Sequence, residues 1–470
     1  MTAQLALLII YSLALMLLGL WIGRRVKGTS EFFVAGRRLG PGLIFSTMLA
    51  ANIGAGSTVG ATGLGYRDGL AAWWWVGSAA VGSAILAMWI GPAIRRVAER
   101  HDLRTVGDYL EFRYSRRVRA IVSVLLWIGS LAILAGQLIA IAWILNVVAG
   151  LPKYQGCLIG GAVVTIYFSA GGLLTSAWVN MVQLSVKLVG FAIALPVALG
   201  AAGGWANVRA LHPSADYWNF TQSGSSGWMY LPLLGPAFMV SPGLLQKIYG
   251  ARDDRAVRLG VGANALGLLL YASVPVVLGM IARVRFPGLP SHELALPMIL
   301  MYGVPPLVGS LGLAAVFSAE VSAADAVLFM LTTSLSQDLY KRFVDPGADD
   351  RRTLLVTRCT AVVAGAIGIA LAIAAQGVID VLTFFYTLLT VTLFVPVVAG
   401  LYGPRASTGQ ALSAMGAGVA CMIAVQLGTA GRGFGSVTPA LAGLLAALAG
   451  FTVMALSTRG RYERQRAVSA

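Results

Sequence analysis

The chain has 470 residues, of which 58% are hydrophobic and only 11% are charged. A soluble domain needs about 25% charged residues to cover its surface, so most of this surface must face something other than water. The net charge of +16 does not indicate a nucleic-acid-binding protein, because the basic residues lie between apolar runs and are not combined with stacking aromatic residues. The composition therefore predicts one membrane domain with no soluble module attached.

Apolar segments long enough to cross a bilayer, about 20 residues each, follow one another along the chain. The sequence predicts an all-α membrane protein with 13 transmembrane helices, of which the fifth is short and the ninth is long. The expected spans are residues 4–23, 42–66, 70–94, 120–150, 157–170, 176–200, 229–245, 257–282, 305–340, 354–375, 378–401, 410–427 and 437–456.

The basic residues are unevenly distributed between the connections. Counted along the chain, about 27 of the 34 follow odd-numbered spans, as in Arg24-Arg25, Arg95-Arg96 and Lys341-Arg342. The positive-inside rule places such connections in the cytoplasm. We therefore expect a multi-pass protein of the inner (cytoplasmic) membrane, with its N-terminus outside and its C-terminus inside.

Residues typical of catalysis or metal binding do not form a recognisable set. The cysteines have no paired spacing, and the histidines fall in connections or at span edges: Cys157, Cys359, Cys421, His101, His212 and His292. The sequence contains neither an HExxH motif nor a pair of histidines within one span. We expect a protein that is not an enzyme and has no cofactor. A membrane sensor without transport is less favoured, because the tail after Leu456 is too short for a soluble signalling domain.

Two predicted spans contain clusters of glycine and proline that interrupt a helix. One lies at residues 50–57 in the second span, and the other at residues 234–243 in the seventh. In transporters, interrupted helices expose backbone carbonyls and amides near the bilayer midplane, where they bind ions and substrate. Breaks five helices apart are what a transporter built from two five-helix repeats predicts. Any single glycine has the alternative role of close helix packing.

Several motifs occur in a characteristic order along the chain. They are Glu31-Phe32-Phe33-Val34-Ala35-Gly36-Arg37-Arg38-Leu39-Gly40, Ala50-Ala51-Asn52-Ile53, Gln246-Lys247 with Ala251-Arg252-Asp253, Ser336-Gln337-Asp338-Leu339-Tyr340-Lys341, and Gly400-Leu401-Tyr402 with Arg405-Ala406-Ser407. Together they resemble the sodium:solute symporter family, whose members share the leucine-transporter-like fold. The similarity extends over about residues 31–418.

The resemblance implies a particular architecture and a particular ion site. Residues 1–40 would hold an extra N-terminal helix, residues 41–403 a ten-helix core of two inverted five-helix repeats, and residues 404–470 two trailing helices. A substrate pocket would lie at the midplane beside a sodium site, and sodium is the candidate coupling ion. The ligands carried over from the family are the carbonyls of Ala50, Ile53 and Ala319 and the hydroxyl of Ser322.

Three departures from the family pattern affect that ion site. Ala323 replaces a second hydroxyl, and Asn180 replaces a carboxylate that assists sodium. Lys187 lies seven residues after Asn180, on nearly the same helix face and about 10 Å along the axis. In sodium-independent relatives of the fold, a lysine on this helix takes the place of sodium. The resemblance therefore favours cation-coupled symport and leaves open a proton-coupled or ion-independent transporter in which Lys187 replaces the ion.

The buried charges near this site have a second interpretation. A charged residue near mid-bilayer costs at least about 2.5–3.5 kcal/mol and rarely faces lipid. Lys187 could pair with Asp325, which shares a helix face with Ser322 at i, i+3 spacing. Glu320 lies off that face, and we expect it only to pack against a polar group inside the bundle.

The resemblance also locates the substrate pocket. Its contacts map to Ser57, Trp75, Val76 and Phe385. Val76 stands where sugar-binding members have a carboxylate, so an amino acid, a carboxylate or a quaternary amine is favoured over a sugar. The sequence thus predicts a secondary active transporter that works by alternating access. Its expected partners are a small-molecule substrate and the lipid bilayer, with no nucleic acid and no obligatory protein partner.

Overall fold

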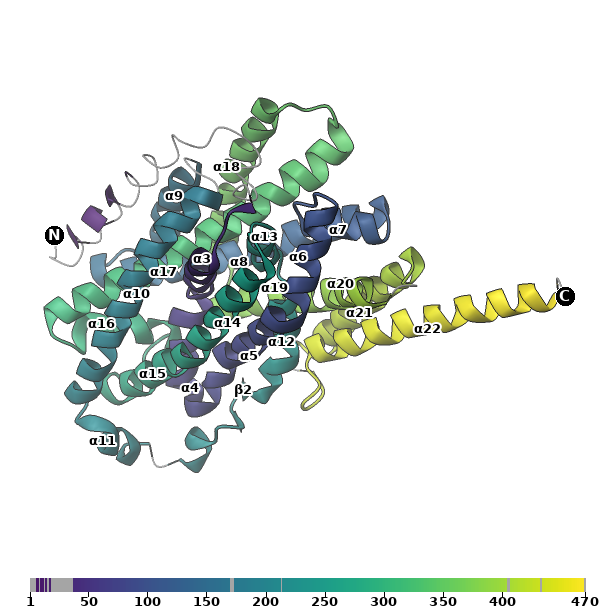
Figure 1. Cartoon of the computed structure of the whole chain (residues 1–470). Helices are drawn as coiled ribbons and strands as arrows, with labels where there is room; N and C mark the ends of the chain where they lie inside the picture. Colours follow the sequence, from purple (N-terminus) through teal and green to yellow (C-terminus); the bar gives the residue numbers. More distant parts are fainter. Residues whose placement is uncertain are drawn as a thin grey trace.

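Helices make up nearly all of the structure, a computed structural model in which long apolar helices pack side by side (Figure 1). It describes residues 6–7, 9–11, 13–14, 17, 37–169, 173–212, 214–403, 406–431 and 433–468. Most of the predicted first span, residues 4–23, and most of the predicted N-terminal segment 1–40 therefore lie outside the described residues.

The helical elements follow one another with short connections. In the first half they are α3 (Pro41–Asn52), η2 (Gly56–Gly60), α4 (Ala61–Asp68), η3 (Gly69–Ala72), α5 (Trp73–Ile85), η4 (Leu86–Ile90), α6 (Gly91–Arg100), α7 (Val106–Arg113), α8 (Arg116–Ala149), α9 (Lys153–Ser169), α10 (Leu173–Ala201), α11 (Gly204–Ala210) and η5 (Ala215–Trp218). A two-stranded antiparallel ribbon follows, formed by β1 (Gln222–Ser223) and β2 (Ser226–Gly227).

Helical elements continue through the second half. They are η6 (Trp228–Tyr230), α12 (Leu231–Val240), α13 (Pro242–Tyr249), α14 (Asp254–Tyr271), α15 (Ser273–Arg285), η7 (His292–Leu294), α16 (Ala295–Tyr302), α17 (Pro306–Thr333), η8 (Ser334–Val344), α18 (Asp350–Ala374), α19 (Val378–Leu389), η9 (Thr390–Phe394), α20 (Val395–Tyr402), α21 (Thr408–Gly428) and α22 (Pro439–Val468).

Both predicted helix interruptions are present. Helix α3 ends at Asn52, and the helical path resumes at η2, so residues 53–55 form a first break. Helix α12 ends at Val240 and α13 begins at Pro242, with Ser241 in a non-helical conformation between them. Proline suits the first turn of a helix because it lacks an N–H that would otherwise be unpaired there. The glycine and proline clusters therefore predicted both breaks correctly.

Ten helices in the described part of the chain are long and apolar enough to cross a membrane. The predicted fifth span appears as α9, which has only 17 residues, and the run Gly56–Arg100 joins parts of two predicted spans. The helical membrane architecture is thus confirmed. The count of 13 helices and the inverted repeats remain predictions.

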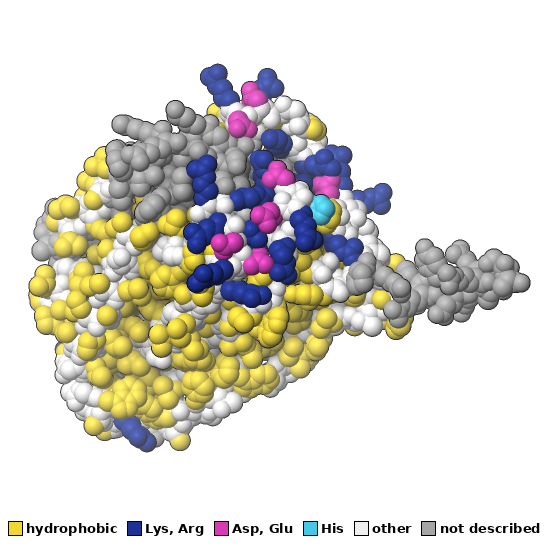
Figure 2. All heavy atoms as spheres, in the orientation of Figure 1, with side chains coloured by type: hydrophobic (Ala, Val, Ile, Leu, Met, Phe, Trp, Pro, Cys, Tyr) yellow, Lys and Arg dark blue, Asp and Glu magenta, His cyan; other side chains and the backbone are white. Residues whose placement is uncertain are grey.

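The face of the molecule seen in Figure 2 has an apolar body and a charged end. Hydrophobic side chains cover the flanks, whereas basic and acidic side chains gather over α6 and α7 (Figure 2). Among the charged groups, Arg95 and Arg96 pair with Asp254 at 2.9 and 2.8 Å. Inside the bundle, α3, α10 and α17 pack against one another. This three-helix contact holds the candidate site.

Candidate ion and substrate site

At the first break, the backbone lies in close contact with neighbouring side chains. A Cβ atom on Gly54 would lie 2.4 Å from the Ala323 Cβ and 2.8 Å from Gln137 Oε1. Gln137 Oε1 accepts a hydrogen bond from the Ala55 amide at 2.9 Å, and the Ser57 hydroxyl donates to Asn52 O at 2.9 Å. Non-helical backbone is tolerated at membrane depth only where protein or a cavity satisfies it in this way.

Lys187, in α10, is buried and reaches this break. Its Nζ donates hydrogen bonds to Ala50 O at 2.5 Å, Ile53 O at 3.1 Å and Ser322 Oγ at 2.5 Å. An ammonium has three N–H groups, so these acceptors use all of them. The Ser322 hydroxyl lies 2.9 Å from Ala50 O and 3.1 Å from Ala319 O. The structure therefore gathers five of the six residues expected at the ion site.

Asp325, the sixth of those residues, acts on a different lysine. Its charge acts on Lys247, whereas Glu320 is the carboxylate whose charge acts on Lys187. Glu320 Oε1 lies 2.6 Å from the Thr58 hydroxyl. Helix periodicity placed Glu320 off the ion-site face, and only the packing of α17 against the residues after the first break gives it a partner.

A cavity of about 80 Å³ opens beside the first break. All four residues expected to bind substrate line it: Ser57, Trp75, Val76 and Phe385. The lining also contains Gln137 and Lys247, which were not predicted there. Gln137 is one of the few polar residues in the long apolar span 120–150, and this was the available signal in the sequence.

Aromatic rings enclose one side of the cavity. The Trp75 ring lies 5.0 Å from that of Tyr230 and 6.2 Å from that of Tyr386, between centroids. Tyr386 also contacts Phe385 at 5.2 Å. Such edge and tilted contacts make a rigid apolar wall. Phe384, in contrast, is exposed.

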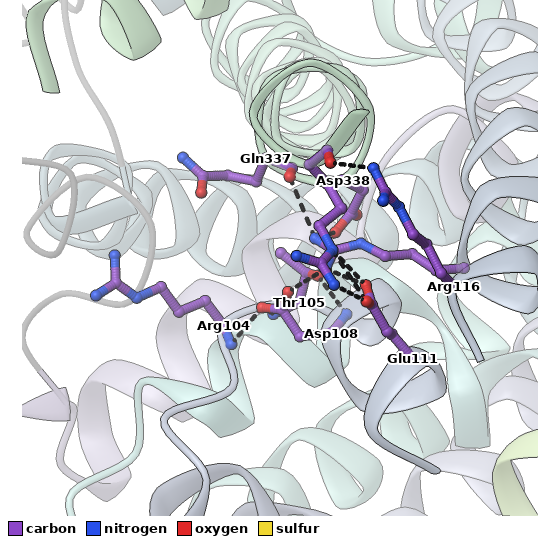
Figure 3. A network of polar contacts seen from close by, with 9 residues as sticks. Arg104, Thr105, Asp108, Glu111, Arg116, Gln337 and Asp338 are labelled. Atoms are coloured by element: carbon purple, nitrogen blue, oxygen red, sulfur yellow. Dashed lines mark hydrogen bonds and ion pairs between the residues drawn. The ribbon is translucent and has the colours of Figure 1, made fainter. Parts of the chain in front are cut away.

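At the charged end of the bundle, ion pairs join α7 to α8 and η8 (Figure 3). Arg119 contacts Asp108 at 2.8 Å, Glu111 at 3.0 Å and Asp338 at 2.8 Å, and Arg342 also pairs with Glu111. Burial acts to raise the pKa of Glu111, but the hydrogen bonds and charges of Arg342 and Arg119 outweigh it and lower the pKa below 4.5. These pairs fix the relative positions of three elements that are distant in sequence.

The fold matches that of solved membrane transporters. The structure of a Na⁺-coupled sialic acid symporter superposes with a TM-score of 0.82 at 17% identity, over 97% of each chain. Mhp1, a nucleobase-cation-symport-1 family transporter, superposes with a TM-score of 0.59 at 16% identity, over 92% of this chain and 96% of that one. At these identities the likeness establishes the fold, which is leucine-transporter-like as expected.

The chain belongs to the sodium:solute symporter family, whose model matches residues 32–418. It is 28% identical over 461 residues to the sodium/pantothenate symporter of Escherichia coli (strain K12), with 91% of each chain covered. It is 25% identical over 454 residues to the human sodium/iodide cotransporter, covering 88% of this chain and 69% of that protein. The protein is therefore a secondary transporter of a small molecule rather than an enzyme, and sodium is consistent as its coupling ion.

Proposed function

We propose that the protein moves a small organic solute that bears a carboxylate, by alternating access. The supporting observation is the cavity lining, in which Lys247 is the one charged side chain among the described residues. Trp75 and Phe385 provide an apolar wall for the body of an organic solute, and Val76 offers a sugar hydroxyl no hydrogen bond. Of the classes left open by the sequence, a free carboxylate or an amino acid fits this lining better than a quaternary amine.

The coupling mechanism in this proposal depends on Lys187. Its ammonium stands at the oxygens of Ala50, Ile53 and Ser322, where sodium would bind. A sodium ion at that position would have to displace a buried group of the same charge, so transport is proton-coupled or independent of an ion there. Cation-coupled symport is the second candidate, favoured by the relatives that are named as sodium symporters.

The proposed layout retains the expected arrangement in the membrane. An extra helix lies in residues 1–40, two inverted five-helix repeats in residues 41–403, and two trailing helices in residues 404–470. The protein resides in the inner membrane with its N-terminus outside. The charged end over α6 and α7 then faces the cytoplasm, in agreement with the positive-inside rule.

Uptake into proteoliposomes tests the proposed solute class. The panel is pantothenate, sialic acid, choline, iodide and glucose, the solutes of related symporters. We expect a carboxylate, pantothenate or sialic acid, to enter, and Lys247→Met to reduce that uptake at least tenfold. The matched control is Lys153→Met, because the Nζ of Lys153 donates to Ala375 O, away from the cavity. Entry of choline or glucose without either carboxylate would refute the proposal.

A further inference from the structure

A second buried ionisable group, Glu320, lies beside the first break. It is fully buried in α17, and its Oε1 lies 2.6 Å from the Thr58 hydroxyl. Its Oε2 has no hydrogen-bond partner among the described residues. Burying an ionised carboxylate is costly unless several donors satisfy its oxygens. One contact for two oxygens is therefore a poor environment for the charged form.

The hydrogen atoms at this contact can be counted. The Thr58 hydroxyl has one proton and lies 2.6 Å from Glu320 Oε1 and 2.9 Å from Gly54 O. A carboxylate and a carbonyl both only accept, so a single proton would have to serve two acceptors. A protonated Glu320 removes the conflict, because its O–H donates to Thr58 and Thr58 donates to Gly54 O. The geometry thus matches a protonated Glu320 carboxyl that is linked to the first break by two successive hydrogen bonds, to Thr58 and from Thr58 to Gly54 O.

Two ionisable groups face this carboxyl. The charge of Lys187, from α10, acts on Glu320. Tyr271, from α14, is neutral, lies close enough for the charge of an ionised Glu320 to act on it, and has a buried hydroxyl with no partner among the described residues. All three N–H groups of Lys187 already donate to Ala50 O, Ile53 O and Ser322 Oγ. Lys187 therefore favours the ionised form of Glu320 without supplying it a hydrogen bond. Deprotonation of Glu320 would leave it and Lys187 as a pair of opposite charges, whereas protonation of Glu320 leaves the Lys187 ammonium without that counter-charge.

We propose that Glu320 is the proton-binding residue of the transport cycle and that its protonation state controls the first break; this rests on the proposed transport function. With the proton bound, the hydrogen bonds from Glu320 to Thr58 and from Thr58 to Gly54 O hold the first break and the start of η2 against α17. On release, the Glu320 O–H bond breaks and the proton passes to entering water. The single Thr58 proton is then shared between two acceptors, the Glu320 carboxylate and Gly54 O. The contact at Gly54 then weakens, and the break is free to rearrange.

Infrared spectroscopy of the purified full chain in lipid tests the protonated state without any solute. We expect the carbonyl band of a buried carboxylic acid at neutral pH, lost in Glu320→Gln. The matched control is Glu293→Gln, because Glu293 is also buried but accepts hydrogen bonds from Trp143 Nε1 and the Val378 amide. Thr58→Val should shift the band, and this variant decides the matter if Glu320→Gln does not fold. A band unchanged in the folded Glu320→Gln protein, or unshifted in Thr58→Val, overturns the inference.

A transport measurement tests the role of the proton. An inside-alkaline pH gradient should accelerate pantothenate or sialic acid uptake severalfold in the wild type, and Glu320→Gln should lose that acceleration. Acceleration that persists in Glu320→Gln overturns the inference. If the band is present but no solute of the panel enters, the proposed function fails instead. The two failures are thus distinguishable.

Discussion

Replacing Lys187 with methionine should destabilise the protein by a predictable amount. Methionine is of similar length, so the change isolates the ammonium. Ile53 O loses its Lys187 donor, whereas Ala50 O keeps the Ser322 hydroxyl at 2.9 Å. An orphaned buried acceptor costs about 1–3 kcal/mol, and we expect the free energy of unfolding to fall by about that amount. Lys153→Met removes a hydrogen bond to Ala375 O from a half-buried lysine and should cost less.

The same site allows a test with sodium. Lys187→Ala empties space at the oxygens of Ala50, Ile53 and Ser322, so sodium should bind there and raise the melting temperature in detergent. Sodium at 100 times its dissociation constant would contribute about 2.7 kcal/mol. The assay compares sodium chloride with choline chloride at equal ionic strength, in the wild type and in the variant. If sodium stabilises the wild type and has no effect on Lys187→Ala, the assignment of Lys187 to the ion position is wrong.

Two further predictions concern the break and the charged end. Gly54→Ala should cost about 1–3 kcal/mol in thermal unfolding, because its Cβ would lie 2.4 Å from the Ala323 Cβ. Gly416→Ala, inside α21 with no atom of another part of the chain within 4 Å of its Cβ, should be neutral or stabilise by up to about 1 kcal/mol. Glu111 has a lowered pKa in the folded protein, so its contribution to stability is complete at neutral pH and is lost as the pH falls below about 4.5. Melting temperatures between neutral pH and pH about 3 should therefore fall more steeply in the wild type than in Glu111→Gln, and equal slopes would contradict this.

Local properties of the sequence predicted much of this protein. Apolar length identified the membrane-spanning helices, because hydrocarbon accepts only segments that satisfy their own backbone. Glycine and proline clusters located the breaks at residues 53–55 and at Ser241, because these residues weaken or end a helix wherever they occur. The position of Lys187 indicated a functional residue, because a charged side chain inside an apolar span is costly. The resemblance to a family supplied the oxygens that it contacts.

Tertiary structure decided which buried charges face one another. Periodicity along α17 placed Asp325 with Ser322 and gave Glu320 only an unnamed polar neighbour, yet Glu320 is the carboxylate that contacts Thr58 and whose charge acts on Lys187. Helix periodicity gives the direction of a side chain around one axis only. Its partners depend on where two axes cross and on how far one helix is displaced along the other. In a medium of low dielectric constant a shift of a few ångströms changes which groups interact, so the arrangement of these charges emerged only from the packed bundle.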